Sequence, residues 1–386
     1  MKKRNFHELE LSQLGFGLMR LPVIEGDDEG DNGRIDVAKA EVILEEAINS
    51  GVNYIDTAWP YHKGHSEEFA GNFFERTGLR DQIYLATKLP CWLCETPEDF
   101  DKYLNEQLKR LKTDHIDFYL IHAMDRPRLN KMLELGYGEF LDRAKSDGRI
   151  RYAGFSFHDD YDVFTDILDS YPFDFCQIQL NYMDQDFQAG LKGLKTASDR
   201  GLGVMIMEPL KGGQLARTPK GRLKELWDSF DTDETPASLG LKWVWSHPEV
   251  TVVLSGMGSA DQVRENIKTA QTAGPGTLSE KDNRMIDRLI EFYRNSTAVP
   301  CTGCKYCIDC PQGIPIASIF KYWNEALQYG NVESSRKRYR ENIAPENKAD
   351  RCIQCGSCED KCPQGISVIE KLQEAHAFLT GTGSPE

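Results

Sequence analysis

Three strand-like runs end in side chains that can take part in acid and base chemistry. They end in Asp56, Lys88 and His122, and Tyr61 follows the first run closely. A phenol is a weak proton donor near neutral pH because its ordinary pKa is about 10. A neighbouring ammonium group lowers that pKa, and a carboxylate paired with the ammonium keeps it charged and in place. These residue types predict a proton-donating site, with His122 able to hydrogen-bond the oxygen that Tyr61 protonates.

The runs that carry these residues belong to a longer alternation of strand and helix patterns. Strand-like segments recur at Leu14, Val52, Ile83, Ile116, Ile150, Phe175, Gly203 and Val250. Amphipathic helical patterns separate them, which favours a closed parallel barrel over an open sheet. In such a barrel the loops at the carboxyl ends of the strands form the active face, so Asp56 and Tyr61 should point into it. Taken alone, the first run would favour a simpler interpretation, a buried Asp at a strand end and a surface Tyr.

The four side chains stand in motifs that together resemble the aldo/keto reductase family. The motifs are D-x4-Y at Asp56 to Tyr61, T-K at Thr87-Lys88 and L-x-H at Leu120 to His122. The resemblance runs from about Leu14 to Asn266 and implies a (β/α)8 TIM barrel, assigned to residues 1–296. It implies hydride transfer between NADP(H) or NAD(H) and a small carbonyl or alcohol. Tyr61 would be the general acid, Lys88 and Asp56 its tuning pair, and His122 the residue that orients the substrate.

The resemblance also implies a set of nucleotide contacts. Ser156 and Gln179 would hold the nicotinamide carboxamide, while Met207 replaces the aromatic residue that stacks on the ring in the family. Phe157 likewise replaces the usual Asn. The other implied contacts are Pro209, Leu210, Gly212, Gly213, Ser255, Gly256, Gly258, Gln262, Glu265 and Asn266.

Two glycine-containing segments are suited to phosphate. The loop Lys211-Gly212-Gly213 exposes backbone, and Gly256 and Gly258 open a helix whose free N–H groups can receive a phosphate. Alone, the second segment fits an ordinary strand-to-helix turn. Gly256 and Gln262 replace basic residues that often read the 2′-phosphate in the family, and Arg264 is a weak substitute. The choice between NADH and NADPH is therefore open.

Eight of the eleven cysteines fall in two clusters near the C-terminus. The first has the spacing C-x2-C-x2-C-x2-C-P, and the second has C-x2-C-x2-C-x3-C-P, the bacterial ferredoxin spacing. In that pattern three close thiolates serve one 4Fe-4S cluster, and the cysteine before Pro reaches the other. The predicted sets are Cys301, Cys304, Cys307 and Cys362 for one cluster and Cys352, Cys355, Cys358 and Cys310 for the second. Zinc usually takes two separated pairs instead.

The segment 297–386 is accordingly predicted to be a small α-helical ferredoxin-type domain with two 4Fe-4S clusters. Helical patterns cover 316–329 and 333–342, and a Pro-Gln-Gly-Ile sequence follows each cysteine run, which indicates an internal duplication. Cys91 and Cys94 form a further C-x2-C pair, interpreted as lining of a substrate loop in preference to a redox or metal pair. The segments 91–96 and 124–135 are expected to be loops that shape the pocket.

Composition limits the partners and the compartment. The chain of 386 residues has 46 Lys and Arg against 61 Asp and Glu, a formal charge of −15. This acidity argues against nucleic acid and anionic membranes as partners. No run is long and apolar enough to span a bilayer, and the basic start of the chain lacks the apolar core of a signal peptide. We expect a cytoplasmic protein with reduced cysteines.

Three functions fit these observations. The first is nicotinamide-dependent reduction of a carbonyl. Because a nicotinamide gives up two electrons as hydride and each cluster passes one, direct exchange needs an intermediate such as a flavin, for which no motif is evident. The second function is therefore a ferredoxin- or flavin-linked reductase in which the clusters feed the barrel; otherwise the clusters are structural or oxygen-sensing. The third, least favoured, is a non-catalytic redox or oxygen sensor.

Overall fold

The computed structural model describes residues 1–25, 33–301, 303, 307, 310–362 and 364–382. By their internal contacts these residues divide into two units. The barrel unit comprises Met1–Ala216 and Asp233–Asp282, and the C-terminal unit comprises Arg217–Thr232 and Asn283–Glu386. The predicted boundary at residue 297 remains a prediction.

Eight parallel strands close the barrel in the order β10-β3-β4-β5-β6-β7-β8-β9, which confirms the predicted fold class. The strands are β3 (Leu14–Gly17), β4 (Tyr54–Asp56), β5 (Tyr84–Leu89), β6 (Ile116–Met124), β7 (Ile150–Phe157), β8 (Phe175–Gln179), β9 (Gly203–Met207) and β10 (Val252–Ser255). Each is short and almost wholly buried, as expected of parallel strands covered by helices.

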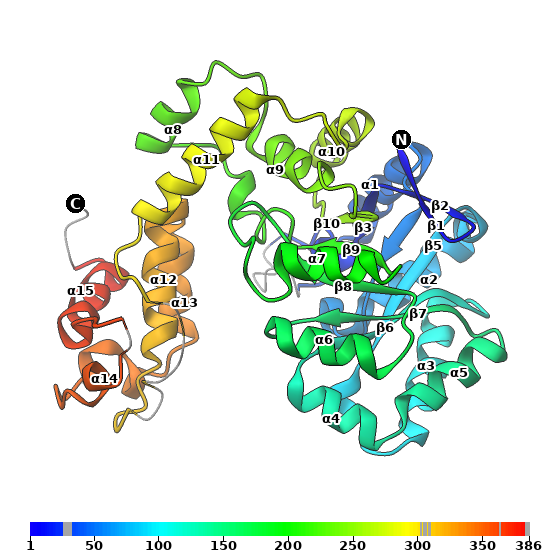
Figure 1. Cartoon of the computed structure of the whole chain (residues 1–386), viewed down its shortest axis with the longest axis horizontal. Helices are drawn as coiled ribbons and strands as arrows, with labels where there is room; N and C mark the ends of the chain where they lie inside the picture. The colour runs from blue at the N-terminus through cyan, green and yellow to red at the C-terminus, as the bar shows by residue number, and fades with distance from the viewer. Residues whose placement is uncertain (26–32, 302, 304–306, 308–309, 363, 383–386) are drawn as a thin grey trace. The chain divides into compact units, whose positions relative to one another are not determined.

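Helices surround the barrel strands in Figure 1. Those of the barrel unit are α1 (Val37–Asn49), α2 (His65–Thr77), α3 (Glu98–Leu111), α4 (Arg126–Glu134), α5 (Tyr137–Ser146), α6 (Tyr161–Ser170), α7 (Gly190–Asp199), α9 (Pro236–Trp245) and α10 (Ala260–Thr272). The segment 124–135, predicted to be a loop, contains α4. Asp125 caps that helix by accepting a hydrogen bond from the N–H of Arg128, and Pro127 stands in its first turn, where proline is tolerated.

A hairpin precedes the barrel. It pairs β1 (Lys3–Phe6) with β2 (Leu9–Ser12) in antiparallel register. Phe6, Leu9 and Leu11 belong to one buried cluster with barrel side chains that include Phe118 and Phe175. These side chains fill the barrel interior. A ligand-binding site of the barrel should therefore lie at the carboxyl ends of the strands.

The C-terminal unit is helical. It contains α8 (Gly221–Asp228), most of α11 (Glu280–Asn295), α12 (Ile316–Tyr329), α13 (Val332–Glu341), α14 (Ser357–Asp360) and α15 (Val368–Thr380). Its core gathers apolar side chains of α12 and α15, including Phe320 and Leu372, and partly buried cysteines pack against that core. The cysteine segments are thereby held on a helical scaffold.

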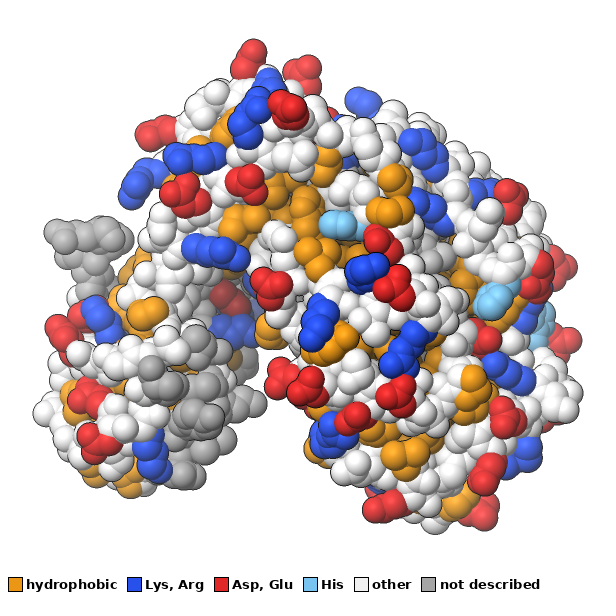
Figure 2. Space-filling view, viewed as in Figure 1, with side chains coloured by type: hydrophobic (Ala, Val, Ile, Leu, Met, Phe, Trp, Pro, Cys, Tyr) orange, Lys and Arg blue, Asp and Glu red, His pale blue; other side chains and the backbone are white. Residues whose placement is uncertain are grey.

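Surface charge is mixed. On the face drawn in Figure 2, acidic and basic side chains are interspersed, and no extended basic patch is visible among the residues drawn there. None of the described helices is both long enough and apolar enough to cross a bilayer.

Candidate active site

The structure brings Asp56, Tyr61, Lys88 and His122 to one cavity of about 530 Å³. Asp56 ends β4, and Lys88 and His122 stand late in β5 and β6. The Lys88 ammonium donates to Asp56 Oδ1 over 2.8 Å and to the Tyr61 hydroxyl over 3.2 Å. The rings of Tyr61 and His122 meet edge to face with centroids 6.3 Å apart. Asp56, Tyr61 and Lys88 thus form one hydrogen-bonded group, and the His122 ring packs beside it.

All three protons of the Lys88 ammonium have acceptors. The third goes to the carbonyl oxygen of Thr57 over 2.8 Å. A lysine side chain has three donors, so this ammonium is fully engaged and its position is fixed. The Thr57 hydroxyl bonds in turn to the Ser66 hydroxyl at the start of α2, 2.8 Å away. The loop that carries Tyr61 is therefore tied to Lys88 and to α2.

A second hydrogen-bond network, which was not predicted from the sequence, links β5 to the neighbouring helices α2 and α3. Gln107 on α3 donates to the Lys88 carbonyl oxygen over 3.0 Å and to the Glu67 carboxylate over 2.6 Å. Glu67 also accepts a 2.7 Å hydrogen bond from the Thr87 hydroxyl, and Tyr119 donates to Gln107. Burial raises the pKa of Glu67 against these hydrogen bonds. The network fixes the backbone at the end of β5 and therefore the position of the Lys88 side chain.

Burial dominates the electrostatics of the four side chains. It raises the pKa of Asp56 and of Tyr61, although Lys88 acts in the opposite direction on both. The Lys88 pKa is raised, because Asp56 and Tyr61 together outweigh the lowering effect of burial. Burial, aided by the charge of Lys88, places the pKa of His122 well below its ordinary value. Burial thus favours the neutral forms of both Tyr61 and His122. The net pKa of Tyr61 is raised, although Lys88 alone would lower it.

Many of the predicted nucleotide contacts line the same cavity. These are Ser156, Met207, Pro209, Leu210, Gly212, Gly213, Ser255 and Gly256. Ser156 is held by the Ala123 N–H, which donates to its hydroxyl over 2.7 Å.

Gln177 lines the cavity where Gln179 was expected. The amide of Gln179 instead donates to Asp184 over 2.9 Å. Gln177 is buried in β8, and its Oε1 atom has no hydrogen-bond partner among the described residues. Because Gln177 lines the cavity, its unpaired amide oxygen suits a carboxamide donor there, so Gln177 fits the role assigned to Gln179 from the sequence.

The remaining predicted nucleotide residues do not line this cavity and are engaged within the protein. The Gly258 N–H donates to Gln262 Oε1 over 2.8 Å, and Asn266 donates to the Ser255 hydroxyl over 2.9 Å. Glu265 accepts a hydrogen bond from Thr235. Gln262 thus bonds to the backbone just before α10, while Asn266 and Glu265 link α10 to β10 and to the start of α9.

Several cavity residues escaped the sequence analysis as site residues. They are Gly17, Met19, Arg20, Pro60, His158, Gln177, Glu208 and Leu254. Most follow the end of a strand by a few positions, which is the one signal available for them.

Cys91 and Cys94 do not line the cavity. Both are buried, and Cys91 Sγ donates to the His122 carbonyl oxygen over 2.9 Å. Burial raises the pKa of each thiol to about 12. Since the thiolate is the reactive form, these two cysteines are inert packing side chains near neutral pH.

The cavity fits a nicotinamide nucleotide. Its volume lies in the range of about 300 to 1,000 Å³ that is usual for ligand sites. Besides Gln177 Oε1, the buried atoms His122 Nδ1 and Asp56 Oδ2 lack partners among the described residues. Buried polar atoms without partners are costly, so a ligand with matching donors and acceptors would stabilise this arrangement.

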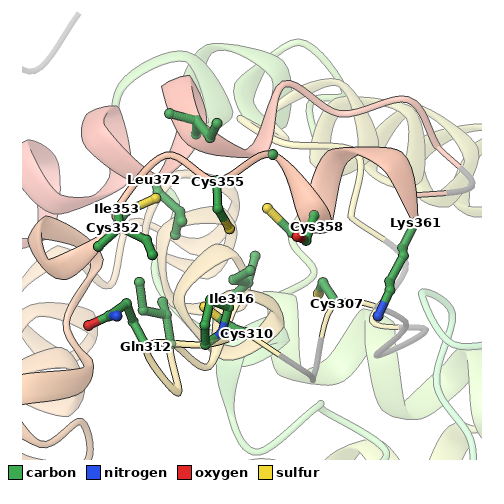
Figure 3. Close-up of a pocket in the computed structure, with 15 residues that line it drawn as sticks. Cys307, Cys310, Gln312, Ile316, Cys352, Ile353, Cys355, Cys358, Lys361 and Leu372 are labelled. Carbon is green, nitrogen blue, oxygen red and sulfur yellow. The ribbon is translucent and has the colours of Figure 1, made fainter.

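A separate cavity in the C-terminal unit is lined by five cysteines: Cys307, Cys310, Cys352, Cys355 and Cys358. Figure 3 shows Cys352, Cys355 and Cys358 on one segment, facing Cys307 and Cys310 on the other. Four of the five are the set predicted for the second cluster. Of the other set, Cys301 and Cys362 are partly buried against the helical core, and Cys304 lies outside the described residues.

This thiol set fits a 4Fe-4S cluster. Such a cluster spreads its thiolates over several irons, so the sulfur atoms surround a space and need not converge on a single ion. Among the described residues no three Cys, His, Asp or Glu side chains converge on one point as they would around a single metal ion. Apolar neighbours such as Ile316 and Leu372 complete the lining of the cavity.

Comparison with known proteins agrees with this description. The aldo/keto reductase family model matches residues 13–291, and a 4Fe-4S dicluster domain model matches residues 300–366. An uncharacterized oxidoreductase of Bacillus subtilis is 26% identical over 70% of this chain and 91% of its own length. An NADH-specific methylglyoxal reductase of Escherichia coli is 25% identical over a match that covers 74% of this chain and 96% of its own length.

Among solved structures, a holo aldo-keto reductase from Bacillus halodurans matches with a TM-score of 0.61 and 28% identity, covering 75% of this chain and 96% of its own. Its match confirms the barrel. The chain is an oxidoreductase that belongs to the aldo/keto reductase family and carries a C-terminal 4Fe-4S domain.

Proposed function

We propose that the protein reduces a small carbonyl compound, or oxidises the corresponding alcohol, with a nicotinamide cofactor in the barrel cavity. The observation that carries the proposal is the Lys88 ammonium, hydrogen-bonded to both Asp56 and the Tyr61 hydroxyl beside His122. When bound, the reduced nicotinamide supplies a hydride to the carbonyl carbon. The side chains of the cavity supply the proton and hold the oxygen.

Tyr61 is the proton donor in this proposal. Its raised pKa keeps the hydroxyl protonated near neutral pH, and the Lys88 ammonium beside it stabilises the phenolate left after proton transfer. Asp56 keeps Lys88 charged. His122, held neutral by burial, donates a hydrogen bond to the carbonyl oxygen and so orients the substrate. The oxygen thereby gains one proton from Tyr61 as the carbon gains the hydride.

The residues that would hold the cofactor are Ser156 and Gln177 at the carboxamide and Gly212 and Gly213 at the pyrophosphate. We further propose a preference for NADH over NADPH. Arg264 is bound by Glu46, with nitrogen to oxygen distances of 2.7 and 3.2 Å, and Gln262 is bound to the Gly258 N–H. Neither side chain is thus ready to receive a 2′-phosphate.

The C-terminal unit would hold two 4Fe-4S clusters. Cys310, Cys352, Cys355 and Cys358 would bind one, and Cys301, Cys304, Cys307 and Cys362 the other, with each cluster able to pass a single electron. The four cysteines of the first set all line one cavity, which supports that set; Cys307 lines the same cavity, and its assignment to the second set rests on the sequence spacing. The same cysteines also fit a second candidate function, a reductase that draws its electrons from ferredoxin or through a flavin.

An anaerobic assay separates the two candidates. Purified protein is incubated with NADH or NADPH and a panel of aldehydes and ketones. Nicotinamide oxidation matched one for one by alcohol formation supports the proposed function. Turnover only with reduced ferredoxin, or flavin bands in the absorption spectrum, would support the electron-transfer reductase and overturn the hydride mechanism.

A further inference from the structure

The turn that carries Tyr61 has an unusual backbone. It is the 3-10 segment Tyr61–Gly64, which lies between β4 and α2. His62 and Lys63 in this turn have φ angles of +50° and +56°, in the left-handed region that is unfavourable for residues other than glycine. Residues in this region persist only where the surrounding structure holds them there, and they cluster at functional sites. The turn beside the proton donor therefore needs a restraint.

The His62 side chain provides such a restraint. Its imidazole is buried, with only 1% of the residue exposed, and its Nδ1 atom lies 3.0 Å from the carbonyl oxygen of Gly33. A carbonyl oxygen can only accept a hydrogen bond, so Nδ1 carries the proton and donates it. The other ring nitrogen, Nε2, has no partner among the described residues. The hydrogen bond to Gly33 thus fixes the orientation of the ring.

The acceptor of this hydrogen bond belongs to a well-anchored part of the chain. Directly after Gly33, two backbone hydrogen bonds of 2.8 and 2.9 Å join residues 34–36 to residues 22–24 around an antiparallel bridge. Asp36, at the end of this bridge, caps α1 by accepting a hydrogen bond from the Lys39 N–H. His62 therefore ties the Tyr61 turn to a segment that is fixed at the start of α1.

The other restraints on Tyr61 are weak by comparison. Its backbone N–H donates to the Ala58 carbonyl oxygen over 3.2 Å, and its hydroxyl accepts from the Lys88 ammonium over 3.2 Å. Both distances are at the long end of the range of about 2.7 to 3.2 Å for such bonds. The position of the hydroxyl next to Lys88 is thus set mainly by the conformation of the turn.

We propose that His62 is a positioning residue, whose hydrogen bond to Gly33 holds the turn and so keeps the Tyr61 hydroxyl beside Lys88. The inference rests on the proposed function, in which Tyr61 donates the proton. A misplacement of about 1 Å at a reacting group can cost about 10² in rate. His62 does not line the cavity, so losing its hydrogen bond should slow the reaction without weakening NADH binding.

Variants of His62 separate the side chain from the backbone. His62→Gly suits the left-handed backbone but removes the hydrogen bond, and it should slow single-turnover NADH oxidation by about 10- to 100-fold. His62→Asn should stay close to the wild-type rate, because its amide nitrogen is one bond from Cγ, as Nδ1 is, and asparagine tolerates the left-handed region. The amide nitrogen of His62→Gln is one bond farther out, so this variant should be slow. His65→Asn, which changes an exposed histidine next to the same turn, is the control.

Single-turnover rates with the most active carbonyl and NADH dissociation constants are measured on the full chain with its clusters. Slow His62→Gly and His62→Gln proteins, with the rate restored in His62→Asn and unchanged NADH binding, would support the proposal. A wild-type rate in His62→Gly would overturn it and assign the residue a backbone role only. Equal losses in the Asn and Gln variants, an equal loss in His65→Asn, or NADH binding that weakens in step with the rate would also overturn it.

Two further outcomes are distinguishable. If His62→Gly does not fold, the comparison of the Asn and Gln variants gives the same test of the hydrogen bond. If the wild-type protein oxidises NADH with a carbonyl but the His62 variants behave alike, only the positioning role fails. If no carbonyl supports NADH oxidation by the wild type, the proposed function and the positioning role both fail.

Discussion

The ion pair between Lys88 and Asp56 is almost completely removed from solvent, with side chains 1% and 4% exposed. Removing one partner of a buried pair leaves the other charge uncompensated, so Lys88→Met should lower the free energy of unfolding by about 3 to 5 kcal/mol. The double variant Asp56→Asn/Lys88→Met should be more stable than Lys88→Met alone. Denaturant titrations of the three proteins test this, and a double variant that is no more stable than Lys88→Met would contradict the pairing.

His122 should make stability depend on pH. Its pKa is well below the ordinary value in the folded protein, whereas the unfolded chain takes up a proton at about pH 6.5. Below that pH the unfolded state binds more protons, so the free energy of unfolding falls as the pH is lowered. His122→Asn should therefore lose less thermal stability than the wild type between pH 7.5 and pH 5. Equal losses in the two proteins would show that His122 is not buried neutral.

Two glutamines in β8 show where reasoning from the sequence fails to identify a site residue. Gln177 and Gln179 stand two positions apart in β8, and such residues point to the same face of a strand. Periodicity cannot choose between them, because the choice depends on where the strand ends relative to the cavity. Arg20 was missed for another reason: its neighbours Gly212 and Gly256 are distant in sequence and come to it only on folding.

At the scale of elements, the strands of the barrel and α12 were predicted well because their periodicity is strong and their ends are marked. The hairpin of β1 and β2 was missed, since its strands of four residues are short and largely polar. The helix α4 was missed because its first turn contains Pro127, which reads as a loop signal unless the Asp125 cap is recognised.

The pairing of α1 with α10 leads to a prediction about cofactor choice. Glu46 on α1 binds Arg264 on α10, and Glu46→Gln should release that guanidinium for a 2′-phosphate. The affinity for NADPH should rise about two- to fivefold, a small factor because exposed ion pairs are weak, while that for NADH stays unchanged. Dissociation constants for both cofactors test this. A wild-type protein that already prefers NADPH would contradict it.

At the scale of the molecule, the cavity that contains Tyr61 is lined wholly by residues of the barrel unit, and the cysteine cavity wholly by residues of the C-terminal unit. Cys355→Ser should therefore remove about half of the bound iron, if two clusters are present, and leave NADH binding intact. Iron analysis and NADH titration of the same anaerobic sample measure both quantities, with Cys176→Ser as a control for loss of a buried barrel cysteine. Full iron content in Cys355→Ser would contradict the ligand assignment.

The central claim is that Tyr61 delivers the proton to a carbonyl oxygen held beside Lys88 and His122. Single-turnover oxidation of bound NADH tests it most directly, with Tyr61→Phe compared with Tyr84→Phe, a tyrosine of β5 that does not line the cavity. The account predicts that Tyr61→Phe slows hydride transfer by about 10² to 10⁴ with an unchanged NADH dissociation constant. A Tyr61→Phe rate within a few-fold of the Tyr84→Phe rate would contradict it.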